Sequence, residues 1–348
     1  MIDATPTTPH FSERGIRSRF RRDVRAMVGL IGVCLLVLIG VCGPLLANRQ
    51  PILCRYDGSW HLPAIVDVIH KLPFSARVVS KSRPFRYPQF DAKRDLPADA
   101  FALWPPIRYG PRETSASILE GPTGSHLLGT DDVGRDVAAR LIHATSASIG
   151  AGLGAMLLAA LIGIPLGGLA GYRGGKTDIL VSRLIELFTC FPVFFLILAV
   201  MAWLGPGTGI AGLAVVIGLV RWTAVARYTR GEFLHLRAED YVLAARTQGA
   251  GLARILFVHL LPNAMGPVLV ALAFGVANVI LIEAGLSWLG FGVQQPDPSW
   301  GNMLRTGYAH LEAAPHLIFA SCAAIFLAVL SCNLTADGLR NALSPKLR

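Results

Sequence analysis

The stretch from Tyr241 to Asn263 reads YVLAARTQGAGLARILFVHLLPN, and the organisation of the whole chain can be worked out from it. Long apolar segments lie on both sides of this stretch. The stretch itself is too polar to cross a membrane, because four polar side chains are spread along it: Arg246, Gln248, Arg254 and His259. Asp240 predicts a helix that begins at Tyr241, since a short carboxylate accepts the unpaired backbone N–H groups of a helix start.

A second short helix is expected over 252–260, after a turn at Gly249 and Gly251, because glycine adopts a left-handed backbone at little steric cost. Pro262 is expected to begin the next element. The small side chains of Ala244 and Ala245 are expected to face outward. We interpret the stretch as two short helices that lie at the membrane surface and dock into a partner.

The flanking segments predict six membrane-spanning helices. Of the 348 residues, 53% are hydrophobic and only 16% are charged, and the mean hydropathy is +0.52. Five windows contain no charged side chain: 26–48, 141–172, 187–220, 255–282 and 313–336. A spanning helix needs about 20 apolar residues, so four windows hold one helix each. The glycines of 205–209 split the remaining window into helices over 187–204 and 210–226. The fold class is therefore an all-α membrane protein.

The placement of positive charge predicts that both termini are cytoplasmic. The first 25 residues hold six arginines against three acids, and residues 227–262 hold five against three. With six spans, these segments and the basic C-terminus lie on one side of the membrane, as the positive-inside rule requires. This placement explains the net charge of +10 without nucleic-acid binding. The chain then divides into five parts. A cytoplasmic basic tail (1–25) is followed by the first transmembrane helix (26–47) and an extracytoplasmic insert (48–126). A core of helices 2 to 6 (127–336), with a loop over 229–263, leads to a cytoplasmic tail (337–348).

The insert over 48–126 contains ten prolines and scattered aromatic side chains. It is too aromatic for a disordered linker and too rich in proline for helices. We expect turns and short strands. Two roles stay open and are compatible: packing against the outer ends of the helices, and docking of a substrate-binding protein.

Glycines at a spacing of four in the second helix predict close helix packing: Gly150, Gly154, Gly163, Gly167 and Gly171. Pro165 and Pro192 are expected to kink their helices. Arg221 lies in the fourth apolar segment, where a charge costs about 2.5–3.5 kcal/mol at mid-bilayer. We expect it to reach the cytoplasmic interface, and a substrate-facing role is the alternative.

Glu283 is expected to close the fifth helix and to begin a Gly/Pro-rich segment over 283–304, which predicts a re-entrant or outer-face loop. Its carboxylate has two possible roles, a structural hydrogen bond or a substrate contact. Four charged residues before the second helix predict a solvated helix start with acids near its N-terminus: Asp131, Asp132, Arg135 and Asp136.

The sequence predicts no catalytic, metal or nucleotide site. No nucleophile or metal ligand accompanies the acids of 131–136, and no pair of cysteines has a ligand spacing. The Gly-Gly-Lys-Thr of 174–177 lacks the glycine five residues before Gly175 that a phosphate-binding loop requires, because Ala170 occupies that position. The chain is therefore not expected to be an enzyme.

The stretch 241–263 also resembles a known family motif. Ala244-Ala245, three residues, Gly249 and then Leu261-Pro262 resemble the EAA loop of ATP-binding-cassette (ABC) importer permeases. Leu243 replaces the glutamate of that motif, and His259 replaces isoleucine. The Tyr-Val-x-Ala-Ala-Arg opening is similar to that of the dipeptide/oligopeptide branch, in which the glutamate is commonly absent.

Three further segments resemble the same branch in the same order. The first is HLLGTDDVGRDV over 126–137, which matches the outer-face signature HxLGTDxxGRDV at Gly129, Thr130, Asp131, Gly134, Arg135 and Asp136. The second is 283–304, in which Gln295 stands where proline is frequent. The third is DGLRNALSP over 337–345, which is similar to the family ending DGLRDALDP.

The resemblance implies a MetI-like permease of the bacterial inner membrane and identifies a coupling loop to an ATPase: Tyr241, Ala244, Ala245, Arg246, Gly249, Leu261 and Pro262. Its implied partners are a second homologous permease, two ATP-binding-cassette ATPase domains that carry the ATP and Mg²⁺, and an extracytoplasmic binding protein. Glu283 and Arg221 are candidates for the pathway. Peptides are the common cargo of this branch, with nickel complexes, opines and glycosides left open.

The alternative is a stand-alone secondary transporter or channel, which needs buried ion-coupling carboxylates or broken helices. The charge-free windows hold no such carboxylate.

Overall fold

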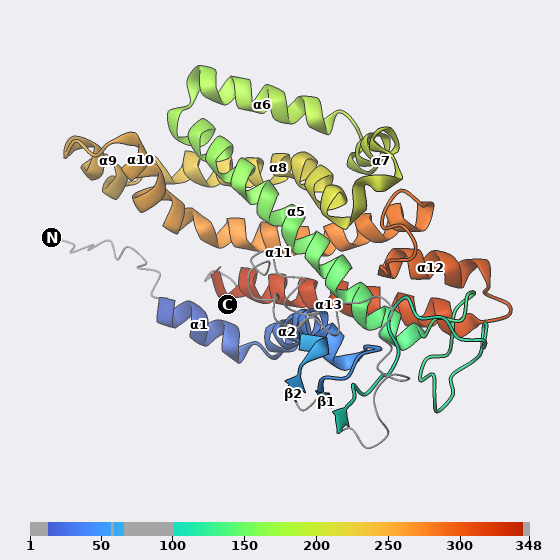
Figure 1. Cartoon of the computed structure of the whole chain (residues 1–348). Helices are drawn as coiled ribbons and strands as arrows, with labels where there is room; N and C mark the ends of the chain where they lie inside the picture. Colours follow the sequence, from blue (N-terminus) through green and yellow to red (C-terminus); the bar gives the residue numbers. More distant parts are fainter. Residues whose placement is uncertain (1–12, 57–58, 66–100, 344–348) are drawn as a thin grey trace.

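A computed structural model describes residues 13–56, 59–65 and 101–343 and shows a bundle of long helices (Figure 1). The spans are α2 (Val24–Leu46), α5 (Val137–Arg173), α8 (Gly209–Leu236), α11 (Leu261–Leu289) with the turns before it, and α13 (Pro315–Leu343). These five are long and apolar enough to cross a membrane, and α6 (Gly175–Thr189) with α7 (Val193–Leu204) forms a sixth if the bent pair is one span. The six predicted spans agree with this architecture.

The bundle has two distinct ends, because α2 runs antiparallel to both α13 and α5. The first turns of α2 pack near the last turns of α13, where Gly29 lies against Leu334, and the other half of α2 reaches α5, where Gly40 lies against Ser146. We call the end that carries the start of α2 and the close of α13 the loop end, because residues 240–260 are also there (Figure 1). The opposite end, which carries the strands of the insert, is the insert end.

The glycines of α5 explain its tight packing against α8. A Cβ at Gly167 would lie 2.2 Å from the carbonyl oxygen of Ala226, and one at Gly163 would lie 2.7 Å from that of Trp222. Gly171 is equally close to the backbone of α8. Close packing at these three positions is confirmed. It is wrong for Gly150, which is exposed and around which a Cβ would have open space.

The third span differs from its prediction in where it begins. It starts at Gly175 rather than Leu187, because three of the four charged side chains of α6 are exposed and the fourth, Asp178, pairs with Arg230. The predicted kink at Pro192 is confirmed: Pro192 directly precedes α7, and the two helices are bent by 76°. Helix α5, in contrast, continues through Pro165.

Three other elements extend beyond their predicted bounds. Helix α8 continues to Leu236 instead of ending near Ala226, and α13 continues to Leu343, so the predicted tail from Asp337 is helical. Part of the predicted N-terminal tail is α1 (Glu13–Arg22), which packs against α2 and α13. The predicted helix ends were placed at charged side chains. The helices continue beyond them, because a helix that leaves the membrane keeps its backbone hydrogen bonds.

The described part of the insert contains the predicted short strands. They form an antiparallel sheet in the order β2 (Ser59–His61), β1 (Leu53–Tyr56), β3 (Ala102–Leu103). Ile107 fastens this segment to the bundle, because its N–H donates to Leu46 O at 3.1 Å and its carbonyl accepts from Asn48 N at 3.2 Å. Packing against the helix ends is therefore confirmed here, whereas the insert over 66–100 lies outside the described residues.

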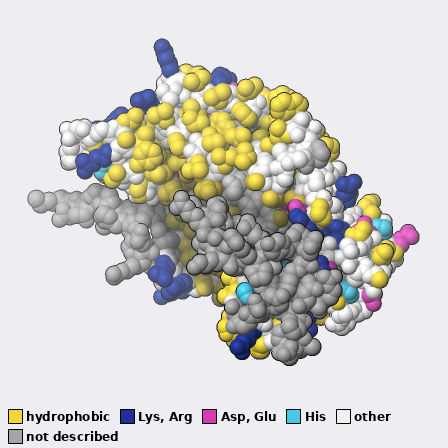
Figure 2. All heavy atoms as spheres, viewed as in Figure 1, with side chains coloured by type: hydrophobic (Ala, Val, Ile, Leu, Met, Phe, Trp, Pro, Cys, Tyr) yellow, Lys and Arg dark blue, Asp and Glu magenta, His cyan; other side chains and the backbone are white. Residues whose placement is uncertain are grey.

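Many large apolar side chains are exposed on the surface of the bundle. Figure 2 shows hydrophobic side chains gathered over the region of α5 and α6, with Lys and Arg near the loop end. Large apolar side chains on these two helices are exposed, including Leu157, Leu161 and Leu180. Apolar side chains are expected on the outside of a helix that faces lipid or another subunit, because that side of the helix is not in contact with water.

Candidate functional site

The predicted loop consists of α9 (Asp240–Thr247), a turn, and a helical segment that leads into α11. Helix α9 begins one residue earlier than predicted. Glu239 is its N-cap, without a side-chain hydrogen bond, so the expected capping role of Asp240 is wrong. Asp240 instead lies in the first turn, where a carboxylate interacts favourably with the helix dipole.

Gly249 ends α9 in a left-handed conformation with φ +77°. Its N–H donates to Arg246 O, and the N–H of Ala250 donates to Ala245 O, both at 3.0 Å. This pair of bonds is a Schellman motif, whose left-handed position favours glycine. A Cβ at Gly249 would contact nothing, so the backbone angle of the turn, rather than crowding, requires glycine.

The second short helix is not a separate element. The segments α10 (Leu252–Arg254) and η5 (Ile255–Leu260) continue into α11 as one helix, with a π-helical stretch before Pro262. Proline has no N–H to donate, and its ring disfavours regular α-helix before it. The N–H of Leu261 accordingly donates to Leu256 O, five residues back. The loop is therefore rigidly joined to the fifth span.

The inner face of the loop packs on the ends of α5 and α8. A buried cluster unites them: Tyr172, Phe233, Val242, Ile255, Leu260 and Ala264. Arg246 adds a polar contact, since its Nε donates to the Tyr172 hydroxyl at 3.0 Å and its guanidinium lies 5.0 Å from the ring centroid. Ala245 is also buried, so of the two alanines only Ala244 faces outward as predicted.

The outer face of the loop offers uncovered apolar side chains. Leu243 is 45% exposed, Phe257 56% and Val258 60%. Tyr241 is exposed as well, and partial burial raises the pKa of its phenol, so it stays neutral at physiological pH. Exposed apolar groups at the edge of a polar loop are typical of a protein contact surface.

A cavity of about 730 Å³ opens between α8, α11 and the last turns of α13. Pro262 and Asn263 line it near the loop, and Arg221 lines it on α8. Because α8 extends to Leu236, Arg221 lies near the middle of the helix. The expectation that its guanidinium reaches the cytoplasmic interface stays a prediction.

Glu283 does not line this cavity. It is completely buried, and its two carboxylate oxygens accept hydrogen bonds from the hydroxyls of Ser148 at 2.8 Å and Ser287 at 2.7 Å. Helix α11 continues six residues beyond it to Leu289, so Glu283 lies inside the fifth span rather than at its end. The structural hydrogen bond is the role that these contacts favour.

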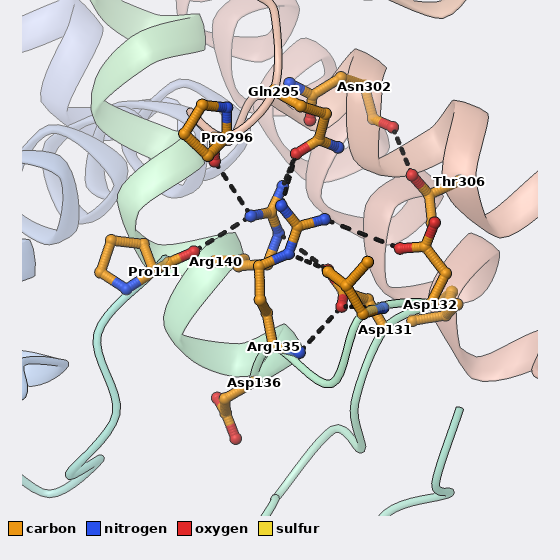
Figure 3. Close-up of polar contacts among 12 residues, drawn as sticks. Pro111, Asp131, Asp132, Arg135, Asp136, Arg140, Gln295, Pro296, Asn302 and Thr306 are labelled. Carbon is orange, nitrogen blue, oxygen red and sulfur yellow. Dashed lines mark hydrogen bonds and ion pairs between the residues drawn. The ribbon is translucent and has the colours of Figure 1, made fainter. Parts of the chain in front are cut away.

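The outer-face signature forms a buried network at the insert end (Figure 3). Asp131 accepts from Arg135 Nε at 2.7 Å and lies 3.4 Å from Arg140 Nε. Both arginines donate to the side-chain oxygen of Gln295, at 2.7 Å and 3.1 Å, and Arg140 also donates to the carbonyls of Pro111 and Pro296. Three separate segments of the chain meet at these two guanidinium groups.

The expectation of a solvated helix start is wrong for three of the four charged residues. Asp131, Arg135 and Asp136 are each at most 6% exposed. Asp136 caps α5 by accepting from Ala139 N at 2.7 Å, and its other oxygen contacts His126 Nδ1 at 2.8 Å. Asp132 remains partly exposed. The acids are buried because each has specific donors, which offset the loss of water.

The glycines of the signature permit this fold. Gly129 and Gly134 have φ +75° and +78°, and a Cβ at either would lie within 2.3 Å of a backbone oxygen. Sequence analysis missed Arg140 and the role of Gln295. Arg140 directly precedes the charge-free window over 141–172. A cation at the start of a membrane span is the feature of the sequence that could have identified it.

Comparison with known proteins assigns the chain to a family. Residues 163–348 match the family described as binding-protein-dependent transport system inner membrane component, and residues 14–59 match the N-terminal transmembrane domain of oligopeptide transport permease C. A dipeptide transport system permease protein of Alkalihalophilus pseudofirmus is 37% identical over 230 residues, 66% of this chain and 75% of that protein.

An oligopeptide transport system permease protein of Bacillus subtilis is 31% identical over 330 residues, which cover 95% of this chain and 88% of that protein. Among solved structures, a chain of the MetNI methionine ABC transporter in inward-facing conformations aligns with a TM-score of 0.47 at 16% identity, over 59% of this chain and 96% of that chain.

Proposed function

Because the chain belongs to the binding-protein-dependent transport system inner membrane components and is a permease subunit of an ABC importer, we propose that it forms half of a translocation pathway for peptides. The names of its relatives support this substrate class, since they are dipeptide and oligopeptide permeases that align over most of their length. The cavity beside Arg221 is large enough for a short peptide.

The loop of residues 240–263 couples this pathway to an ATPase. One observation carries the proposal. The outer face of the loop is exposed, and the C-terminal part of the loop continues through η5 into the membrane span α11. A force on Leu243 or Phe257 would therefore act directly on the wall of the cavity. The contact of Arg246 with Tyr172 transmits the same displacement to α5.

The proposal also includes the remaining partners of an ABC importer. The loop end faces the cytoplasm with both termini, where two ATPase domains bind ATP and Mg²⁺. A second, homologous permease completes the pathway, and an extracytoplasmic binding protein delivers the substrate to the insert end. ATP binding closes the ATPase pair, and the coupled helices swing between two cavity orientations. ATP must favour one orientation by several kcal/mol to shift the population decisively.

Co-purification of the tagged chain tests this proposal. Membranes are solubilised mildly, and the proteins retained with the chain are identified by mass spectrometry. Recovery of a second six-span permease and an ATPase is expected, with the ATPase lost when Gly249 is changed to Val. Recovery of the chain alone in several detergents would refute the proposal and would favour a stand-alone transporter.

A further inference from the structure

Arg221 lies near the middle of α8 (Gly209–Leu236), roughly 20 Å from either end at 1.5 Å per residue. It is half-buried, and its Nε is buried without a hydrogen-bond partner. Among the described residues, no ion pair or hydrogen bond involves this guanidinium. An ionisable group inside a membrane span faces a pathway by default, because the bilayer disfavours an unpaired charge.

Other arginines of the bundle show what a structural guanidinium looks like in this protein. Arg230, on the same helix, forms a two-pronged ion pair with Asp178. Arg140 is almost completely buried and has two carbonyl acceptors and one amide acceptor. Arg221 has neither kind of partner. Its donors are therefore available to a group that the chain itself does not supply.

The cavity around Arg221 limits what that group can be. Apolar side chains such as Met156, Phe274 and Val270 line it, together with uncharged polar side chains such as Tyr228, Asn263 and Asn278. The other charged lining side chains of the described part are Glu232 and Arg340, and Arg340 already pairs with Asp337 at 3.1 Å. An anion that enters this space would meet one unpaired cation, in surroundings where water competes weakly.

We propose that Arg221 binds the C-terminal carboxylate of the transported peptide. The assignment rests on the proposed function, because it requires peptide to be the substrate. A guanidinium presents a planar fork that binds both carboxylate oxygens. Glu232 lies on the same wall eleven residues further along α8, roughly 16 Å away. Since an extended chain covers about 3.4 Å per residue, the amino group of a peptide of four or five residues would point toward Glu232.

Two variants separate this role from a merely structural one. Arg221→Gln removes the charge and the fork, whereas Arg221→Lys keeps the charge. Arg227→Gln is the matched control, because Arg227 lies on the same helix, is exposed and does not line the cavity. Each variant is assembled with the partner permease, the ATPase subunits and the binding protein in proteoliposomes. Uptake of labelled tetraalanine is then measured at saturating loaded binding protein, together with stimulated ATP hydrolysis.

Arg221→Gln is expected to lower tetraalanine uptake at least tenfold, while Arg221→Lys stays within threefold and Arg227→Gln within twofold of the unaltered complex. Tetraalanine-derived probes with a photoreactive group at the last residue should cross-link near Arg221, and probes with the group at the first residue should not. Equal uptake by Arg221→Gln, or cross-links that do not depend on the labelled end, would overturn the assignment. Loss of the partner permease from the Arg221→Gln complex would also overturn it. Such a loss would show that Arg221 pairs with a group of the partner permease in the unaltered complex. An unaltered complex that takes up neither tetraalanine nor dialanine nor trialanine would refute the proposed peptide function itself.

Discussion

Arg246 of the loop holds the last turn of α5 through Tyr172: its Nε donates to the phenol oxygen at 3.0 Å, and its guanidinium lies over the ring at 5.0 Å from the centroid. The two residues are far apart in sequence, and their contact joins the loop to the span whose glycines pack closely against α8. The account of coupling depends on this connection, since a loop that moved independently of α5 and α11 would transmit nothing.

Changing Arg246 to Ala is therefore expected to reduce peptide uptake per ATP hydrolysed by about tenfold. Tyr172→Phe should have a smaller effect, about twofold, because it removes the hydrogen bond and keeps the ring for the cation–π contact. Transport and ATP hydrolysis in proteoliposomes give this ratio. Equal ratios in both variants and the unaltered protein would show that the contact has no part in coupling.

Gly249→Ala is expected to destabilise the loop by about 1–2 kcal/mol, because alanine is strained at φ +77°. Gly251→Ala is the matched control, since Gly251 has φ −68° and a Cβ there would also contact nothing. Retention of the ATPase on the tagged chain measures the effect. Retention should fall for Gly249→Ala and stay normal for Gly251→Ala, and the reverse order would contradict the turn geometry as the cause.

Gly167→Ala should weaken the packing of α5 on α8. The new methyl group would lie 2.2 Å from Ala226 O, so the helices must separate, and overpacking of this kind costs about 1–3 kcal/mol. The thermal unfolding temperature of the purified protein in detergent should fall. Gly150→Ala, on the same helix but with open space around it, should leave that temperature unchanged or raise it slightly, because alanine favours the helix more than glycine does. A similar fall in both variants would contradict close packing at Gly167 as the cause.

Gln295→Ala is expected to destabilise the insert end by about 2–3 kcal/mol. It leaves donors of Arg135 and Arg140 without their acceptor, and unsatisfied charged groups are costly when buried. Gln294→Ala is the control, because Gln294 donates only to carbonyls of its own loop, at Gly290 and Gly292. Hydrogen exchange of the amides of 131–140 should increase in the first variant. Unchanged protection there would show that other acceptors replace the amide.

Sequence patterns predicted the spans and the loop because both depend on local properties. A window of apolar residues is sufficient to identify a membrane helix, and Gly249 marks a turn whatever surrounds it. The ends of helices were less predictable, because charged residues such as those of α6 were read as loop while the backbone stayed helical.

The buried network was not predictable in the same way. Arg135 meets Gln295 across 160 positions of sequence, and nothing local to either residue reveals the contact. The four charged side chains of 131–136 suggested exposure, whereas the fold supplies enough donors and acceptors to bury three of them. Likewise, Pro262 was expected to begin a new element, because only the structure shows that a π-helical stretch joins residues 252–260 to α11.

ATP-dependent uptake of labelled tripeptide by the complete reconstituted transporter tests the central claim most directly. The account predicts accumulation that requires ATP and the loaded binding protein, and that disappears with Gly249→Val while the chain remains in the membrane. Accumulation that needs no ATP and follows an ion gradient would contradict it, and would identify a stand-alone transporter in which the loop has no partner.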